Sequence, residues 1–117
     1  TTLTPTRKGF IPHKFLKSRV HINAVGADAK GKRELELSTL TNIGMIIYDE
    51  WEQCSHSREI QYLSECDRRP VLYSLGEIVS RSLKYNKSDR TSSTLFDATG
   101  LAIEDVATAR YIYEKIK

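Results

Sequence analysis

Cysteine is scarce in this sequence, and its spacing argues against two common classes of site. Only two of the 117 residues are cysteine, Cys54 and Cys66, and they stand twelve positions apart without a C-x-x-C motif or a Cys/His ligand set. A disulfide framework or a zinc site would need a denser pattern. The sequence therefore predicts free thiols in a reducing compartment, and so a cytoplasmic protein without a metal.

Long apolar runs and a strong excess of one charge are also missing. No stretch approaches the roughly twenty apolar residues that cross a bilayer, and no signal-peptide pattern occurs. The net charge is +3, and no aromatic-basic platform or nucleic-acid motif accompanies the lysine and arginine clusters. The sequence thus argues against a membrane or a nucleic acid as partner. Its length and its 39% hydrophobic content predict one globular domain with a real core.

The most informative stretch present runs from Asn23 to Asp28. Val20, Ile22 and Ala24 alternate with other residues in the period of a β-strand, which then enters a loop with Asp28 at its tip and Lys32 four residues later. Loops at the carboxyl ends of parallel strands are where ligands bind in open α/β sheets. A turn in which Asp28 only caps the backbone explains the same residues, and both interpretations stay open at this point.

The segment after this loop predicts a β-α-β unit. Leu37, Leu40 and Ile43 recur at helical spacing, and Gly44 follows as a helix stop signal. The apolar run 45–48 is typical of a strand buried in a parallel sheet. We therefore expect a helix of about two turns that lies on the sheet.

Further elements follow from the remaining patterns. Before the first strand, the opening T-T-L-T-P reads as the tail of a strand inside a fold, and 10–16 predicts a short helical turn. Residues 51–66 predict two helical pieces with a weak spot near Ser57. Ser74 and Glu77 have capping-box spacing and start a helix to about Tyr85.

The last part of the chain predicts a loop, a short strand and a helix. The loop covers 86–93 and the strand 94–98. Acidic residues open the final helix and basic residues close it, as the helix dipole favours. Its apolar stripe steps by four and three residues and consists of Ala102, Val106, Ala109, Tyr113 and Ile116.

Five separated motifs together resemble the ornithine cyclodeaminase/mu-crystallin family, which includes archaeal-type alanine dehydrogenases and ketimine reductases. The motifs are T-T-L-T-P-T-R-K, H-I-N-A-V-G-A-D-A-K-G-K-R-E-L, Y-D-E-W-E-Q, S-L-G-E-I-V and T-L-F-D-A-T-G-L-A-I-E-D-V-A-T-A. The resemblance covers nearly the whole chain and corresponds to the C-terminal third of a family member.

The resemblance implies an α/β fold, the C-terminal part of a Rossmann-type NAD(P)-binding domain with parallel strands and flanking helices, plus closing C-terminal helices. Residues 1–66 would hold the last strands and helices of that domain. Residues 67–117 would hold the closing helices and a short strand leading back to the substrate and dimer domain.

The resemblance also implies roles for single residues. Asp28 would be the catalytic acid/base and a substrate contact, and Thr99 would contact the substrate too. Ala98 replaces a small hydroxyl residue often found there, so a side-chain hydrogen bond is not expected from it. The residues implied in binding the cofactor, NAD or NADP, are Thr4, Val25, Gly26, Ala27, Lys32 and Ala98. Apart from the resemblance, Asp97 stands just before the last helix, and its position is equally consistent with a capping group and with a second carboxylate near the site.

Three functions remain open from the sequence. The first is part of an enzyme that moves a hydride at the α-carbon of an amino acid or imine, inactive as this piece alone. Such a piece would pair with the missing N-terminal part or form a homodimer. The second is a non-catalytic nucleotide-binding protein like mu-crystallin, and the third a self-associating remnant. No G-x-G-x-x-G turn occurs among the six glycines, so these residues lack the family's phosphate cradle and cannot distinguish NAD from NADP.

Overall fold

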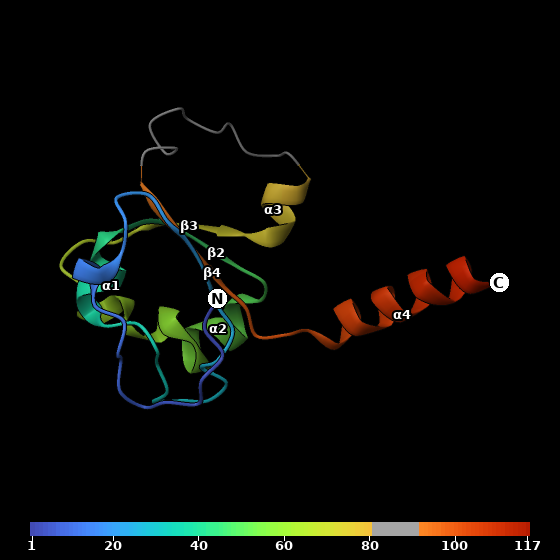
Figure 1. Ribbon diagram of the computed structural model, residues 1–117, viewed down its shortest axis with the longest axis horizontal. Helices are drawn as coiled ribbons and strands as arrows, with labels where there is room; N and C mark the ends of the chain where they lie inside the picture. Colours follow the sequence, from blue (N-terminus) through green and yellow to red (C-terminus); the bar gives the residue numbers. More distant parts are fainter. Residues whose placement is uncertain (81–91) are drawn as a thin grey trace.

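A four-stranded parallel sheet forms the centre of the protein (Figure 1). The computed structural model describes residues 1–80 and 92–117. In these residues the sheet order is β1-β4-β2-β3 and every pair of neighbours is parallel. The strands are β1 (His21–Ala24), β2 (Ile43–Tyr48), β3 (Val71–Ser74) and β4 (Ser93–Asp97). The predicted α/β fold with parallel strands is confirmed.

The last strand in the sequence lies in the middle of the sheet. Leu95 of β4 is paired with Ile22 of β1 on one side and with Ile46 of β2 on the other, and its side chain is fully buried. The predicted strand-helix-strand order from β1 to β2 is confirmed, but the two strands are not neighbours. The carboxyl ends of β1 and β4 consequently lie side by side at the same end of the strands.

Helical segments pack together against the sheet and enclose the core (Figure 1). They are α1 (Leu37–Asn42), α2 (Trp51–Ser57) and the 3₁₀ helix η2 (Glu59–Glu65). The break between α2 and η2 confirms the predicted weak spot near Ser57. A second 3₁₀ turn, η1 (His13–Phe15), confirms the short helical turn. The buried apolar side chains of α1, α2 and η2 contact those of β1, β2 and β4. Members of this core are Ile22, Leu40, Ile46, Cys54, Ile60 and Leu95.

The predicted role of Gly44 as a helix stop is wrong. Helix α1 ends at Asn42, and Ile43 and Gly44 are the first residues of β2. Ile43 is 1% exposed and packs in the core as a strand residue. A Cβ on residue 44 would lie 2.1 Å from the hydroxyl oxygen of Ser92, so glycine is needed here for close strand packing and not for a turn.

Sequence patterns missed β3, although Val71–Ser74 is rich in β-forming residues and follows Pro70. The predicted capping box is confirmed, because Glu77 N donates to Ser74 Oγ and the Glu77 carboxylate accepts from Ser74 N. Helix α3 (Leu75–Val79) begins there. The expected continuation of this helix to Tyr85 lies outside the described residues, as do residues 86–91 of the expected loop. The last residue of that expected loop, Ser93, is the first residue of β4.

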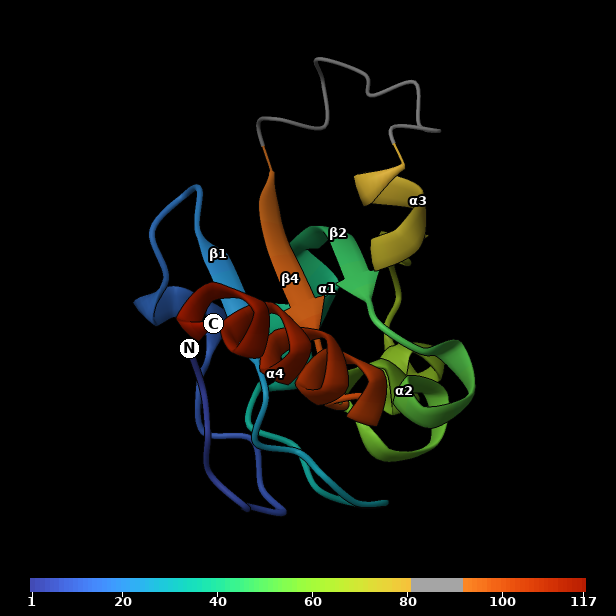
Figure 2. The ribbon, with the colours of Figure 1, turned by 90° about the vertical axis from the view of Figure 1, so that its right-hand side faces the viewer.

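The C-terminal helix α4 (Ala102–Ile116) projects away from the sheet (Figure 1), and Figure 2 views the molecule from the side on which this helix lies. The predicted helix and its charge pattern are confirmed, but none of its residues is buried. In the described part of the chain its apolar stripe has no partner, and Val106, Tyr113 and Ile116 are 63%, 57% and 78% exposed. No helix among the described residues is long and apolar enough to span a bilayer.

Both β3 and β4 come after residue 66 and belong to the same sheet as β1 and β2. The expected division of the chain at that residue therefore passes through one sheet. Its assignment to a nucleotide domain and a closing segment stays a prediction.

Candidate active site

The segments predicted to form the site meet at the carboxyl ends of β1 and β4. Ala24 and Asp97 end these strands as paired neighbours, and Ala98 N donates to Ala24 O at 3.2 Å. On the other side of β1, Thr2 bridges to Ala24 and brings the opening segment alongside. The fold thus gathers residues that are more than 90 positions apart, from Thr4 to Thr99, at one edge of the sheet.

A buried carboxyl group joins two of the predicted cofactor residues. Glu34 is fully buried, and its Oε1 accepts hydrogen bonds from Thr4 N at 2.5 Å and Thr4 Oγ1 at 2.6 Å. Its Oε2 accepts from Gly26 N at 3.2 Å. Glu34 therefore fixes the opening segment against the loop after β1. The Thr4 hydroxyl donates its one hydrogen to Glu34, so toward a ligand it can act only as a hydrogen-bond acceptor.

Asp28 and Lys32 form an ion pair at the tip of the loop. The Asp28 side chain is 64% exposed and that of Lys32 is 18% exposed. The hydrogen bond from Lys32 is the main cause that lowers the pKa of Asp28. Asp28 is consequently ionised near neutral pH, and its side chain faces solvent. The two side chains bind each other, and their roles toward substrate and cofactor stay predictions.

The other predicted cofactor residues differ in access. Val25 is 37% exposed, so its side chain can contact a ligand. Ala27 and Ala98 are 1% and 8% exposed, and a ligand could reach them mainly through their backbone. The buried side chain of Arg58 holds the loop that follows β1, because its Nη1 donates a hydrogen bond to Val25 O at 3.1 Å.

Asp49 holds the loop after β4. It follows β2, and its Oδ2 accepts hydrogen bonds from Thr99 N at 2.6 Å, Thr99 Oγ1 at 2.9 Å and Gly100 N at 3.1 Å. Its Oδ1 accepts from Glu50 N at 2.7 Å and from the Cys54 thiol at 3.2 Å. Burial opposes ionisation, but these hydrogen bonds outweigh it and the pKa of Asp49 is lowered. The predicted substrate residue Thr99 is thus anchored by a carboxylate.

Two further carboxyl groups are buried beneath the corner. Glu59 Oε1 accepts from Glu34 N at 2.6 Å, and Asp97 Oδ2 accepts from Ile60 N at 2.9 Å. Their other oxygens, Glu59 Oε2 and Asp97 Oδ1, are buried without a hydrogen-bond partner among the described residues. Burial raises the pKa of Glu59 to about 7 and that of Asp97 to about 8. Asp97 is therefore a backbone anchor inside the fold. It does not cap the last helix, since α4 has no side-chain cap and Asp97 accepts from Ile60 N instead.

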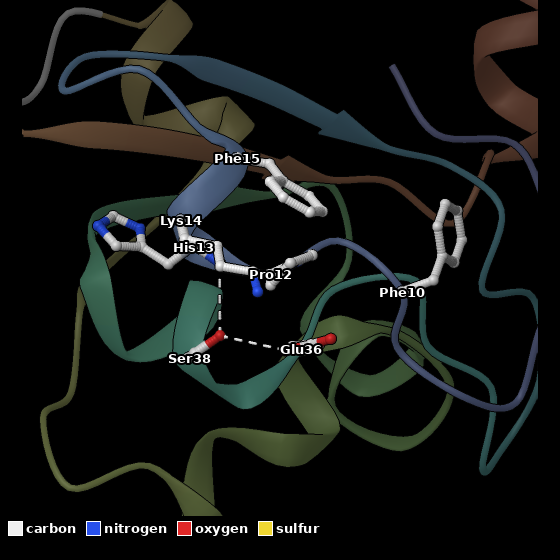
Figure 3. Close-up of a pocket in the computed structure, with 7 residues that line it drawn as sticks. All are labelled: Phe10, Pro12, His13, Lys14, Phe15, Glu36 and Ser38. Carbon is white, nitrogen blue, oxygen red and sulfur yellow. Dashed lines mark hydrogen bonds between the residues drawn. The ribbon is translucent and has the colours of Figure 1, made fainter.

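A surface hollow of about 480 Å³ lies elsewhere, between η1 and the start of α1 (Figure 3). Phe10 and Phe15 are 50% and 74% exposed at its rim, and Ser38 Oγ accepts from His13 N across it at 3.4 Å. None of the predicted site residues lines this hollow. The residues that line it are Phe10, Pro12, His13, Lys14, Phe15, Glu36 and Ser38. We favour as the site the corner formed by the loops after β1 and β4, because the first of these loops carries the ionised Asp28 and Lys32 that proton transfer needs. The larger volume of a hollow does not by itself indicate an active site.

Sequence reasoning missed the side chains that support the corner, namely Glu34, Asp49, Arg58 and Glu59. Asp49 had a usable signal, since it directly follows a buried parallel strand and so belongs at the ligand-facing edge. The others had none, because their partners lie 8 to 33 positions away in the chain. Within residues 1–80 and 92–117, no group of three His, Cys, Asp or Glu side chains is placed to hold a metal ion.

A parallel sheet with helices packed against it and polar loops at its carboxyl edge defines an α/β protein of the Rossmann type. The chain belongs to the ornithine cyclodeaminase/mu-crystallin family, whose model matches residues 1–117. This confirms the family resemblance carried by the five motifs.

Comparison with individual proteins gives the same family. The chain is 37% identical to alanine dehydrogenase of Archaeoglobus fulgidus over 116 residues, which cover 97% of this chain and 35% of that protein. It is 38% identical to ornithine cyclodeaminase of Brucella abortus over 98 residues, 84% of this chain and 26% of that protein. The structure of an archaeal alanine dehydrogenase dimer with bound NAD matches 96% of this chain and 35% of its own, with 36% identity and a TM-score of 0.79.

The chain therefore spans about a third of the length of the relatives it matches. This agrees with the partial coverage expected from the motifs.

Proposed function

We propose that this chain is one part of an NAD(P)-dependent enzyme that acts on an amino acid or an imine by hydride transfer at the α-carbon. The relatives named above act as an alanine dehydrogenase and an ornithine cyclodeaminase, which supports this reaction class. We further propose that the 117 residues alone do not turn over substrate, because a dinucleotide's phosphates need a glycine turn that they do not contain.

The observation that carries the proposal is the Asp28–Lys32 ion pair in the loop that follows β1, whose carboxyl end is paired with that of β4. When an amino acid is oxidised at its α-carbon, the carbon gives up a hydride and the nitrogen gives up a proton. Asp28 is ionised and so can accept that proton, and a bound nicotinamide ring that excluded water from the carboxylate would raise its pKa toward the operating pH. Lys32 keeps Asp28 in the ionised form and limits its orientation.

The residues fit the nicotinamide end of the cofactor. The half-exposed Val25 side chain offers an apolar contact for a flat ring, beside the lone pairs of the Thr4 hydroxyl. A bound nicotinamide would supply the hydride acceptor or donor. Thr99 lies on the opposite loop, where it would contact the substrate, so the two loops would hold the reacting groups together.

Replacement of Asp28 by asparagine tests the catalytic role. In the purified protein at its natural length, amino-acid-dependent NADH formation is expected to fall by about 100-fold or more, since a positioned proton acceptor contributes about that factor. L-alanine is the substrate for this assay. Cyclodeamination of L-ornithine would return the hydride to the imine and leave no net NADH, so ammonia release is the readout for that substrate. NADH binding, followed by fluorescence, is expected to change little.

Asp67→Asn is the matched control, because Asp67 is an exposed carboxylate outside the site. Equal activity of the Asp28→Asn variant and the parent protein would exclude Asp28 as the acid/base. Tight NADH binding without turnover of any amino acid or imine would favour the mu-crystallin-like binding protein instead.

A self-associating chain is the second candidate, and the exposed apolar stripe of α4 favours it. An intact mass near 13.4 kDa for the source protein, together with a defined oligomer that ignores NAD(H), would support this candidate over the enzyme. A mass about three times larger would support the enzyme.

A further inference from the structure

Thr99 has a hydroxyl group whose hydrogen is already committed. Its Oγ1 lies 2.9 Å from Asp49 Oδ2, which also accepts from the backbone N–H groups of Thr99 and Gly100. The other oxygen, Asp49 Oδ1, accepts from Glu50 N and the Cys54 thiol. Every contact that surrounds this carboxylate is thus a donor.

The protonation state of Asp49 decides which way the hydroxyl hydrogen points. Four N–H and O–H donors stabilise the carboxylate form, together with the Cys54 thiol, whose one hydrogen is shared with Asp97 O. The pKa of Asp49 is lowered despite its partial burial. An ionised carboxylate has no proton to donate, so Thr99 must donate to it. A hydroxyl has one hydrogen and two lone pairs, and toward the site Thr99 therefore presents only lone pairs.

We propose that Thr99, oriented by Asp49, selects ligand groups that carry an N–H, and so faces the amino or imino nitrogen of the substrate and not its carboxylate. The inference rests on the proposed function, in which Thr99 contacts the substrate. A carboxylate in the same place would meet lone pairs and the negative charge of Asp49 behind them. A cationic nitrogen would instead meet an oxygen that the charge of Asp49 polarises favourably.

The same chemistry is present in the carboxamide of a nicotinamide ring, which also carries N–H groups. Thr99 is partly exposed, so either ligand can reach it. The two sources can be separated by paired probes that differ only in the nitrogen group. One pair is L-alanine and propionate, which lacks the amino group and any other donor at the α-carbon, and the other is NAD and its nicotinic acid analogue.

The first test examines the orientation of the hydroxyl without any ligand. In the protein at its natural length, NMR titration is expected to show a higher pKa for Asp49 in Thr99→Val than in the parent, because valine has the same shape and no hydroxyl. Thr99→Ser keeps the hydroxyl and is expected to keep the low pKa. An unchanged pKa in Thr99→Val would overturn the inference, whatever the protein binds.

The second test measures selectivity in the protein at its natural length. The parent and Thr99→Ser are expected to bind the N–H probe of one pair about 10- to 100-fold more tightly, which is the usual effect of a hydrogen bond to a charged group. Thr99→Val should lose that preference. If Thr99→Val loses the preference for L-alanine over its partner probe, the substrate nitrogen lies at Thr99. If it loses the preference for NAD over the nicotinic acid analogue, the carboxamide lies at Thr99, and the assignment to the substrate is overturned.

A preference that survives in Thr99→Val for both pairs would overturn the inference while leaving the proposed function intact. A parent protein that binds neither nucleotides nor amino acids would instead contradict the proposed function, and with it the selectivity part of the inference.

Discussion

Raising the pH from 5 to 9 is expected to lower the free energy of unfolding of this chain by several kcal/mol. Glu59 and Asp97 are buried, and their pKa values in the fold are about 7 and about 8. In the unfolded chain both groups return to ordinary values near 4. Each unit of difference contributes about 1.4 kcal/mol, so the combined effect is comparable with the whole stability of a small domain, about 5–15 kcal/mol.

The direction follows from proton binding. Both pKa values are raised in the fold, so between pH 5 and 8 the folded chain holds protons that the unfolded chain has lost. The stabilisation is fully present below the unfolded pKa values and is lost as the pH rises through 7 and then 8. Urea denaturation at a series of pH values measures this slope.

Isosteric amides provide the controls for this pH dependence. Glu59→Gln and Asp97→Asn keep an acceptor oxygen for the Glu34 and Ile60 backbone N–H groups but cannot ionise. Each should flatten the slope, and Glu65→Gln, a change at an exposed glutamate, should leave it as it is. Stability that is constant or rises between pH 5 and 9 would contradict the assigned pKa shifts.

Replacing Gly26 by alanine is expected to disrupt the corner and to destabilise the chain by about 3 kcal/mol. A Cβ at this position would lie 2.4 Å from Thr4 N and 2.6 Å from Glu34 Oε2. Overpacking of this kind costs about 1–3 kcal/mol. The shift would also pull the Thr4 and Gly26 donors away from the buried Glu34 carboxyl group, and buried groups that lose their partners cost about as much again.

Gly76→Ala is a matched control. Gly76 lies in α3, and the nearest atom to an added Cβ is Ser74 Oγ at 4.0 Å. Alanine is the better helix former, so this variant should be neutral or slightly more stable. Denaturation midpoints and the amide signals of Thr4 and Gly26 report both changes. A Gly26→Ala variant as stable as Gly76→Ala, with unchanged Thr4 signals, would refute the close approach seen at the corner.

Much of the fold followed from local patterns. The alternation at Val20–Ala24 and the apolar run before Tyr48 predicted strands because side-chain periodicity records which face is buried. The Ser74 capping box was confirmed because both of its partners lie within one turn. Gly44 was misread since a glycine stops a helix or admits a close strand neighbour, and only the position of Ser92 decides which.

The candidate site was predictable only in part. The strand-end rule led to Asp28, and the family resemblance added Thr4 and Thr99. The supporting groups depend on contacts between distant segments, such as Glu34 with Thr4 and Asp49 with Thr99, which are 30 and 50 positions apart. No local pattern records such pairs.

The central position of β4 has a consequence for folding during synthesis. His21 of β1 pairs with Thr94, 73 positions later, and β2 meets the same strand from the other side. Until residues 93–97 leave the ribosome, β1 and β2 have no common neighbour, and β2 can pair only with β3. Contacts this distant slow folding and prolong exposure to aggregation. This sheet is therefore completed only after residues 93–97 have been synthesised, so translation rate and chaperone access bear on the yield of folded protein.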